Sequence, residues 1–186
     1  MTEMIDVLNA DGTKTGRAAP KEQIFRKGLW HRGATLCVIN DRGEFLLHKR
    51  SPHKRWVPNV WANGTAGRVD AGESATDAII RESFEELGLT IPESDLIHIG
   101  NFRVEEENPP HGWSRVIFDV FLIRGDYRLN RMRLNVFEVS EARYVAIDKL
   151  EEFMDRNPTI TTLRDHIWPM VKKYLETNEG LNKCIQ

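Results

Sequence analysis

The chain has 186 residues, of which 40% are hydrophobic and 29% are charged. This is the composition of an ordinary globular protein of about one domain, and it excludes an intrinsically disordered chain. The 26 Lys and Arg residues nearly balance the 28 Asp and Glu residues, which gives a net charge of -2. Such a balance argues against a protein that coats nucleic acid, so we expect no nucleic-acid partner.

Neither a membrane span nor a secretion signal is expected. The apolar stretches over 35–39 and 116–123 are far shorter than a membrane span, and Asp119 interrupts the second. The first residues, MTEMIDVLNADG, carry acids where a secretory signal needs basic residues and then an apolar run. Cys37 and Cys184 lie far apart and form no CxxC motif. We therefore expect a cytoplasmic protein with no membrane partner and no disulfide framework.

Apolar periodicity and turn residues predict a single domain that mixes helices and strands. Up to residue 66, the pattern predicts a strand over 5–8, a helix over 21–27 that Gly28 ends, a hairpin of strands 34–39 and 44–48, a basic loop over 51–58 and a strand over 60–66. Further on, it predicts strands over 97–104, 114–123 and 142–146, a helix near 148–154 and a closing helix over 161–177 that Pro169 kinks. We assign 1–29 to an N-terminal strand and helix extension of the same domain, 30–177 to its main part and 178–186 to a frayed tail.

The clearest predicted helix runs over 74–87. Ile80, Phe84 and Leu87 fall at helical spacing and predict its apolar face, and Gly88 stands where a C-terminal cap belongs.

Three carboxylates crowd one face of this helix, since Glu82, Glu85 and Glu86 are three or four residues apart. Like charges so placed repel, and the C-terminal half of a helix also disfavours anions. A divalent cation such as Mg²⁺ reverses both penalties. Arg81, four residues before Glu85, can orient the cluster. The alternative is a solvated acidic helix end without a ligand.

The surrounding spacing favours the metal site. In the pattern G-x5-E-x7-R-E-U-x-E-E-x-G-U, where U is a bulky apolar residue, every fixed polar or glycine position is matched: Gly67, Glu73, Arg81, Glu82, Glu85, Glu86 and Gly88. Leu89 supplies the last apolar position, and Ser83 departs from the other. The segment 67–89 therefore resembles the Nudix box, and the predicted strand order over roughly 30–155 is similar to that of Nudix domains.

This resemblance implies an α/β fold, an α/β/α sandwich with a mixed β-sheet, in a hydrolase that uses Mg²⁺ or Mn²⁺ to cleave a diphosphate linkage. It makes Glu82, Glu85 and Glu86 metal ligands, with the carbonyl of Gly67 as a further one, whereas Glu73, Arg81 and Gly88 hold the motif in shape. A metal-activated water attacks phosphorus in such enzymes.

A general base would assist this attack, and Glu85 or Glu86 can serve, as can an acid from a distant loop. Glu138 is the preferred distant acid, because similar family members often place an acid there; Glu138 and Glu141 can equally be surface acids. The run 105–107 is a second set of candidates, ranked lower because consecutive acids are typical of a solvated turn.

Type I isopentenyl-diphosphate isomerases share this fold, and residues 31–74 also resemble them. The shared positions are His31, Lys49, Arg50, Trp61 and Asn63. The catalytic Cys and metal-binding His of those isomerases are replaced by Ala66 and Arg68, and neither Cys37 nor Cys184 is placed to substitute. Hydrolysis is therefore preferred over isomerisation, which needs an acid and a base on the allylic carbon. A non-catalytic nucleotide-binding Nudix domain is a third alternative.

The expected substrate is a small diphosphate, either a nucleoside diphosphate derivative or a small organic diphosphate. Lys49, Arg50 and Arg68 are candidate phosphate contacts. Trp61 and Trp56 can stack on a base, although aromatic residues beside strands more often pack in a core. Many relatives dimerise, so a homodimer is compatible with the resemblance.

Overall fold

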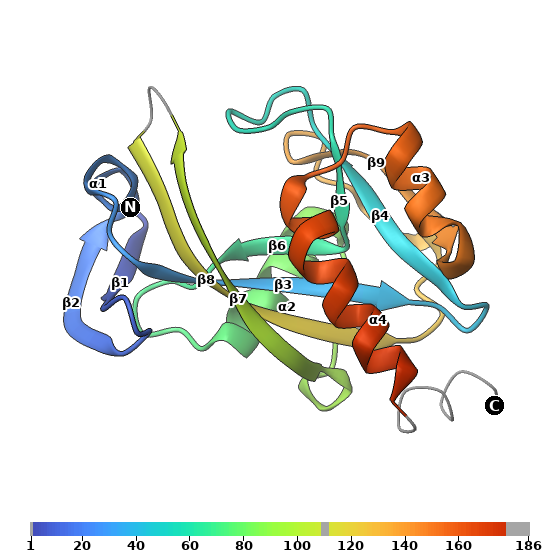
Figure 1. Ribbon diagram of the computed structural model, residues 1–186, viewed down its shortest axis with the longest axis horizontal. Helices are drawn as coiled ribbons and strands as arrows, with labels where there is room; N and C mark the ends of the chain where they lie inside the picture. Colours follow the sequence, from blue (N-terminus) through green and yellow to red (C-terminus); the bar gives the residue numbers. More distant parts are fainter. Residues whose placement is uncertain (1, 109–111, 178–186) are drawn as a thin grey trace.

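The computed structural model describes residues 2–108 and 112–177, which fold around a mixed seven-stranded sheet (Figure 1). Its strands are β3 (His31–Ile39), β4 (Glu44–Arg50), β5 (Trp61–Asn63), β6 (Thr65–Arg68), β7 (Ile97–Asn108), β8 (Gly112–Arg124) and β9 (Val139–Ala146). They run in the order β5-β4-β3-β8-β7, with β6 beside β3 and β9 beside β4. The pairing of β3 with β8 is parallel, whereas the other pairs in this sheet are antiparallel.

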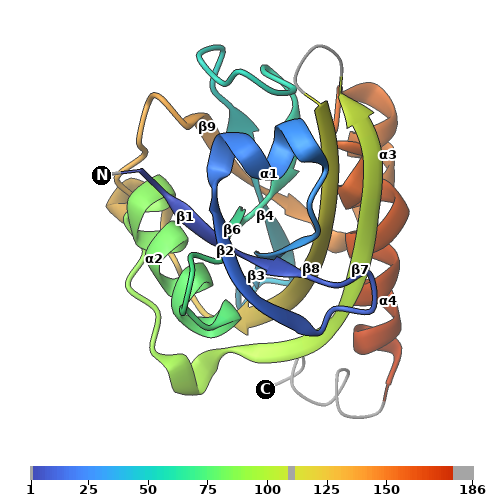
Figure 2. The same cartoon turned by 90° about the vertical axis from the view of Figure 1, so that its left-hand side faces the viewer.

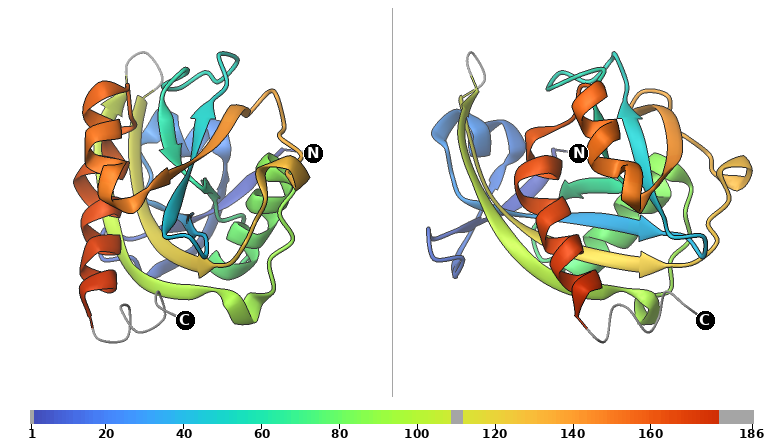
Figure 3. Two further views of the ribbon diagram at one scale, coloured as in Figure 1. Left: turned by 90° about the vertical axis from the view of Figure 1, so that its right-hand side faces the viewer. Right: turned by 45° about the vertical axis from the view of Figure 1, so that its right-hand side comes forward.

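Helices cover both faces of the sheet (Figure 3). One face packs on α2 (Ala75–Leu87), and the other packs on α3 (Leu150–Arg156) and α4 (Trp168–Glu176). Successive side chains of β3 point to opposite faces, so Leu36 lies in the α2 layer and Cys37 in the α3 and α4 layer. This arrangement confirms the expected α/β/α sandwich with a mixed sheet.

The predicted hairpin of β3 and β4 is present, but the two strands pair directly only at Ile39 and Phe45, beside the turn. Beyond that point β3 pairs with β6, and β4 pairs with β5. The single strand predicted over 60–66 is therefore divided. Gly64 marks the break, where a side chain would collide with the carbonyl oxygen of Leu36. This splitting places β6 beside α2.

The N-terminal unit consists of β1 (Met4–Leu8), β2 (Lys14–Pro20) and α1 (Lys21–Lys27). The sequence did not predict β2, because KTGRAAP has no alternating apolar pattern. The unit has its own small core, formed by Ile5, Val7, Ala19 and Ile24 with the half-buried Leu29. Bridges from Ile5 to Asp70 and from Leu8 to Trp30 join it to the main sheet, and Figure 2 shows it in blue, facing the viewer.

The C-terminal helical stretch begins at 161, as predicted, but it is not a regular α-helix throughout. A wider, π-helical turn over Leu163–Ile167 precedes α4, and Pro169 lies in the first turn of α4, where its missing N–H is tolerated. Short 3-10 turns lie at Glu93–Asp95, Leu129–Arg131 and Ile147–Lys149. None of the helices in 2–108 and 112–177 is long and apolar enough to cross a membrane. The predicted tail 178–186, with Cys184, lies outside the described residues.

Candidate active site

The motif-bearing helix begins and ends where its sequence predicts. Ser74 caps α2 by accepting a 3.0 Å hydrogen bond from the backbone N–H of Asp77. Gly88 takes a left-handed conformation with φ +68°, and its N–H donates to the carbonyl of Phe84 at 2.9 Å. Only glycine adopts this conformation without strain, so Gly88 ends the helix cleanly.

The predicted apolar face of α2 is wrong in part, because Phe84 is 64% exposed. The buried face instead carries Ile79, Ser83 and Leu87, together with Glu86. Ser83 satisfies its buried hydroxyl by donating to the carbonyl of Ile79 at 2.6 Å. Both faces have helical spacing, so periodicity alone did not distinguish them.

An ion pair joins the two ends of the motif. Arg81 donates from Nε and Nη2 to the two carboxylate oxygens of Glu73, each at 2.9 Å. Its Nη2 also donates to the carbonyl of Arg68 at 3.1 Å, and Glu73 accepts from the N–H of Asp70 at 2.9 Å. Arg81 and Glu73 thus tie β6, the connecting loop and α2 together.

The same guanidinium reaches the acidic face. Nη1 of Arg81 lies 2.9 Å from Oε1 of Glu82 and 3.4 Å from Oε2 of Glu85. Burial, with the nearby charge of Glu86, raises the pKa of Glu82 to about 7. Gly67 lies against this carboxyl, because a side chain at 67 would collide with it. The geometry therefore brings Gly67, Arg81 and the acids into one cluster.

Glu86 is 6% exposed and accepts a hydrogen bond from the hydroxyl of Thr65 on β6. Burial raises its pKa, and the charge of Glu138 adds to that rise. Glu138 directly precedes β9 and forms an ion pair with Lys54. The fold thus brings an acid from a distant segment near α2. The alternative acids over 105–107 lie in β7, where Glu105 pairs with Arg115 at 2.8 Å, and not in the expected loop.

The carboxylates fit a hard cation chemically. Both Glu82 and Glu86 are desolvated acids; the charge of Glu86 raises the pKa of Glu82, and that of Glu138 raises the pKa of Glu86. A divalent cation relieves such an environment. In 2–108 and 112–177, however, no three His, Cys, Asp or Glu side chains are gathered as a ready metal site. The acids are instead engaged by Arg81 and Thr65.

The candidate phosphate contacts already have partners. Arg50 donates from Nη2 to the carbonyl of Trp56 at 2.7 Å and from Nε to that of Val57 at 2.9 Å. Arg68 pairs through Nε with Glu3 at 3.0 Å. Lys49 occupies a half-buried position of β4, next to Arg50 in the sequence. Their assignment as phosphate contacts stays a prediction.

Trp61 is a core residue, with only 5% of its surface exposed. Its ring packs edge to face against Phe153 at 5.3 Å, and the guanidinium of Arg143 lies 5.3 Å from its centroid. These contacts match the packing alternative, and substrate contact by Trp61 stays a prediction.

Sequence reasoning missed a buried polar network beneath the site. His48 donates from Nδ1 to the carbonyl of Gly64 at 2.6 Å, and burial lowers the pKa of His48 to about 4. Asn63 donates to the hydroxyl of Thr35 at 2.8 Å, which donates to the carbonyl of Thr65 at 3.1 Å. The sequence did carry a signal for this network, namely polar residues inside strands that were predicted to be buried.

The isomerase positions lack their reactive groups. Ala66 is exposed on β6, and Cys37 is fully buried, with the pKa of its thiol raised by burial. His31 is 2% exposed, and burial lowers its pKa to about 4. None of these residues offers an accessible acid or base.

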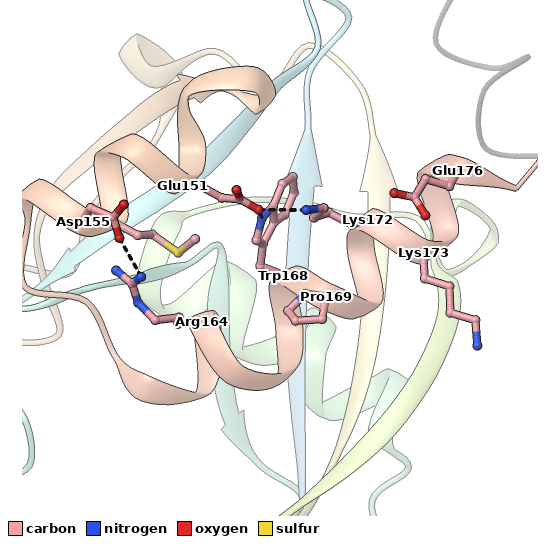
Figure 4. Close-up of a pocket in the computed structure, with 9 residues that line it drawn as sticks. Glu151, Asp155, Arg164, Trp168, Pro169, Lys172, Lys173 and Glu176 are labelled. Carbon is pink, nitrogen blue, oxygen red and sulfur yellow. Dashed lines mark hydrogen bonds and ion pairs between the residues drawn. The ribbon is translucent and has the colours of Figure 1, made fainter.

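A hollow of about 460 Å³ lies between α3 and α4, away from the acidic cluster (Figure 4). Glu151 accepts hydrogen bonds from Nε1 of Trp168 and Nζ of Lys172, both at 2.9 Å. Asp155 pairs with Arg164 at 2.7 Å. These mutually satisfied charges lie on the sheet face opposite α2, so the hollow does not belong to this site.

Proteins of known family resemble most of this chain. Residues 29–165 match the family model of the NUDIX domain. The chain is 31% identical over 146 residues to an uncharacterized Nudix hydrolase of Listeria monocytogenes, covering 78% of this chain and 81% of that one. It is also 31% identical over 159 residues to an isopentenyl-diphosphate Delta-isomerase of Paenarthrobacter aurescens, covering 85% and 84%.

The fold resembles that of the DR0079 crystal structure from Deinococcus radiodurans, with a TM-score of 0.68 at 18% identity, over 99% of this chain and 100% of the other. The matched family model, the relatives and the shared fold agree, and the chain belongs to the Nudix hydrolase family.

Proposed function

We propose that the chain hydrolyses a diphosphate linkage in a nucleoside diphosphate derivative or a small organic diphosphate. The observation that carries this proposal is the cluster of acids around Gly67 and Arg81, which Glu138 approaches from another part of the chain. A structural ion pair does not need two desolvated acids beside each other. Hydrolysis of a diphosphate does use neighbouring acids, because they hold the divalent cation.

In this proposal Glu82, Glu85, Glu86 and the carbonyl of Gly67 hold Mg²⁺ or Mn²⁺, which supplies charge neutralisation and an acidified water when bound. Arg81, through Glu73, keeps the loop and helix in position.

Glu138, or alternatively Glu85 or Glu86, accepts the proton of the attacking water. The water oxygen bonds to phosphorus as the bridging P–O bond breaks, and the departing phosphate keeps the bonding electron pair. Lys49, Arg50 and Arg68 are the cations proposed to bind the substrate phosphates, with Trp61 at the edge of this group.

Isomerisation of isopentenyl diphosphate is the second candidate, because an isomerase is among the relatives at 31% identity. The exposed Ala66 and the ion-paired Arg68 argue against it, since neither supplies the required acid or metal ligand. A domain that binds nucleotide without turnover is the third candidate.

A Mg²⁺-dependent phosphate-release screen tests the proposal. The panel comprises nucleoside di- and triphosphates, nucleotide sugars, dinucleotide cofactors, thiamine diphosphate and isopentenyl diphosphate, with the last also assayed for isomerisation. We expect release from one class, abolished by a chelator and restored by Mg²⁺ or Mn²⁺. Isomerised product, or nucleotide binding without release, would replace the hydrolase assignment.

Glu85→Gln and Glu86→Gln are each expected to lower kcat by ~10²-fold or more while leaving the fold intact, because each removes a charge that the reaction needs. The exposed Glu93, on a 3-10 turn, provides the matched control Glu93→Gln, which should turn over like the wild type. Near-wild-type rates in both α2 variants would refute the metal-site assignment.

A further inference from the structure

Glu138 ends a turn whose other side chains are exposed. Val136 and Phe137, the two residues before it, are 64% and 68% exposed. Apolar packing therefore contributes little to the position of this turn, so its polar contacts decide where Glu138 lies. These contacts come from two segments of the chain, one on each side of Asn135 and Ser51.

Asn135 ties the turn to the end of α2. Its N–H donates to the carbonyl of Glu86 at 2.9 Å, and its own carbonyl accepts from the N–H groups of Glu138 and Val139 at 2.8 and 2.7 Å. Its side-chain Oδ1 accepts from the N–H of Phe137 at 3.2 Å. A single residue thus links the backbone of Glu138 to that of Glu86.

Ser51, directly after β4, holds the same turn from a distant part of the chain. Its N–H donates to the carbonyl of Glu138 at 2.9 Å, and its hydroxyl donates to that of Val136 at 2.7 Å. The hydroxyl also accepts from the N–H of His53 at 3.3 Å. Because Ser51 is fully buried, these hydrogen bonds are shielded from water. One side chain thereby joins the basic loop to the turn that carries Glu138.

A bulge in the pairing of β4 with β9 lies next to this contact. Lys49 pairs with Glu141 and Arg50 pairs with Val139, so the register skips Ser140. Such a bulge bends its strand and changes the direction of the side chains beside it. The acid that directly precedes β9 therefore owes its direction to this bend and to the contacts beyond it.

The turn that begins at Ser51 also supplies a cation to this acid. The N–H of Lys54 donates to the carbonyl of Ser51 at 3.1 Å, and its ammonium forms the ion pair with Glu138. The charges of Lys54 and Glu138 act in opposite directions on the pKa of Glu86, so both lie near it. The backbone and the carboxylate of Glu138 are thus held by one short turn.

We propose that Ser51 is a positioning residue, which holds the carboxylate of Glu138 near Glu86 so that Glu138 accepts the proton of the attacking water. This inference rests on the proposed diphosphate hydrolysis and selects one base for it. Without the hydroxyl of Ser51, the carbonyl of the exposed Val136 turns to water and the turn moves with it. A displacement of about 1 Å is costly for a catalytic group.

A double-mutant cycle between Ser51 and Glu138 tests the proposal on the substrate found by the screen. Ser51→Ala should lower kcat by ~10-fold and leave KM unchanged, because the hydroxyl places the acid and does not contact the substrate. In the Glu138→Gln background the same substitution should cost nothing further, since no carboxylate remains to be placed. An equal loss in both backgrounds, or a wild-type kcat in Ser51→Ala, would overturn the inference.

Thr15→Val is the matched control. The hydroxyl of Thr15 donates to the carbonyl of Val7 at 2.7 Å, as that of Ser51 does to its partner, but within the N-terminal unit. This variant loses a comparable hydrogen bond away from the acids and should turn over like the wild type.

A second variant keeps the proposal testable if Ser51→Ala fails to fold. Asn135→Ala removes the side-chain contact to the N–H of Phe137 and loosens the same turn from its other side. We expect the same pattern, a lower kcat that depends on the presence of Glu138. A wild-type kcat in Asn135→Ala, or a loss that persists in Glu138→Gln, would refute the proposal.

Carbon NMR at fixed pH separates this inference from the proposed function, because it does not depend on turnover. The side-chain carboxyl resonance of Glu138, identified by its loss in Glu138→Gln, should shift in Ser51→Ala and stay in place in Thr15→Val. An unmoved resonance in Ser51→Ala would overturn the positioning role, whatever the rate. A shifted resonance without hydrolysis of any substrate in the panel would overturn the hydrolase and leave the placement of Glu138 by Ser51 intact.

Discussion

Burial is the largest cause of the pKa shift at two histidines, His31 and His48. Both are held neutral inside the fold, with a pKa of about 4. Each imidazole donates from Nδ1 to a backbone carbonyl, His48 to that of Gly64 and His31 to that of Leu29. Buried neutral imidazoles of this kind make folding stability sensitive to mild acid.

Stability should therefore fall between about pH 6.5 and pH 4. Above the ordinary histidine pKa, His48 is neutral in both the unfolded and the folded chain. Its full contribution to the free energy of unfolding is therefore present there. Below it the unfolded chain takes up a proton that the folded chain refuses until about pH 4. At pH 5 this costs at most about 2 kcal/mol per histidine.

Denaturant unfolding of His48→Asn at pH 7 and pH 5 checks this expectation. Asn preserves a donor for the Gly64 carbonyl but cannot be protonated, so the variant should lose less stability on acidification than the wild type. The exposed His53 provides the control His53→Asn. An unchanged pH dependence in His48→Asn would contradict the assignment.

At the scale of elements, the β6–loop–α2 unit depends on one guanidinium. Arg81 contacts Glu73, Glu82, Glu85 and the backbone of Arg68, so it joins three segments of the motif. The planar guanidinium has several N–H donors in fixed directions, so it makes these contacts simultaneously. A lysine ammonium is a single charged centre and does not. This contact positions Glu82 and Glu85 relative to β6, whereas Glu86 is held by the hydroxyl of Thr65.

Arg81→Lys should lower kcat by ~10²-fold, because small displacements of catalytic groups are costly even when the charge is kept. Steady-state kinetics on the substrate found by the screen, with thermal unfolding in parallel, measures this. Arg103→Lys, at an exposed position of β7, is the control. A rate like that of the wild type would show that the fork geometry is dispensable.

The sequence predicted this unit closely. The predicted helix over 74–87 ends at Gly88 as expected, and the resemblance to the Nudix box gave Glu73 and Arg81 the role of holding loop and helix together, because such features lie within one short motif. It did not identify the buried face of α2, since Ile79 and Ile80 both fit a helical period. Packing beneath the sheet resolved that choice, leaving Phe84 in solvent.

At the scale of the whole molecule, the site combines segments far apart in the chain. Glu138 precedes β9, Thr65 lies on β6, and Glu82, Glu85 and Glu86 lie on α2. Pairing of β9 with β4 brings Glu138 near Glu86. The sheet thus determines which of the chain's many acids reaches α2.

Glu138→Gln is expected to lower kcat by about 10- to 100-fold and to flatten the acidic limb of the pH–rate profile, as for loss of a general base. The neighbouring acid Glu141 provides the control, because it pairs with Arg143 at 2.8 Å on the same strand. Glu141→Gln should retain the wild-type rate and profile. Equal effects of the two substitutions would assign Glu138 a surface role.

The sequence by itself determined the acidic helix and its end at Gly88, because these follow from spacing along a short stretch of chain. The resemblance of that stretch to the Nudix box then implied the family and the mixed sheet. The tertiary structure decided what depends on contacts between distant residues: the break at Gly64 against Leu36, the ion pair of Arg68 with Glu3 and the approach of Glu138 to Glu86. Such contacts leave no local periodicity, since the residues involved meet only when the sheet forms.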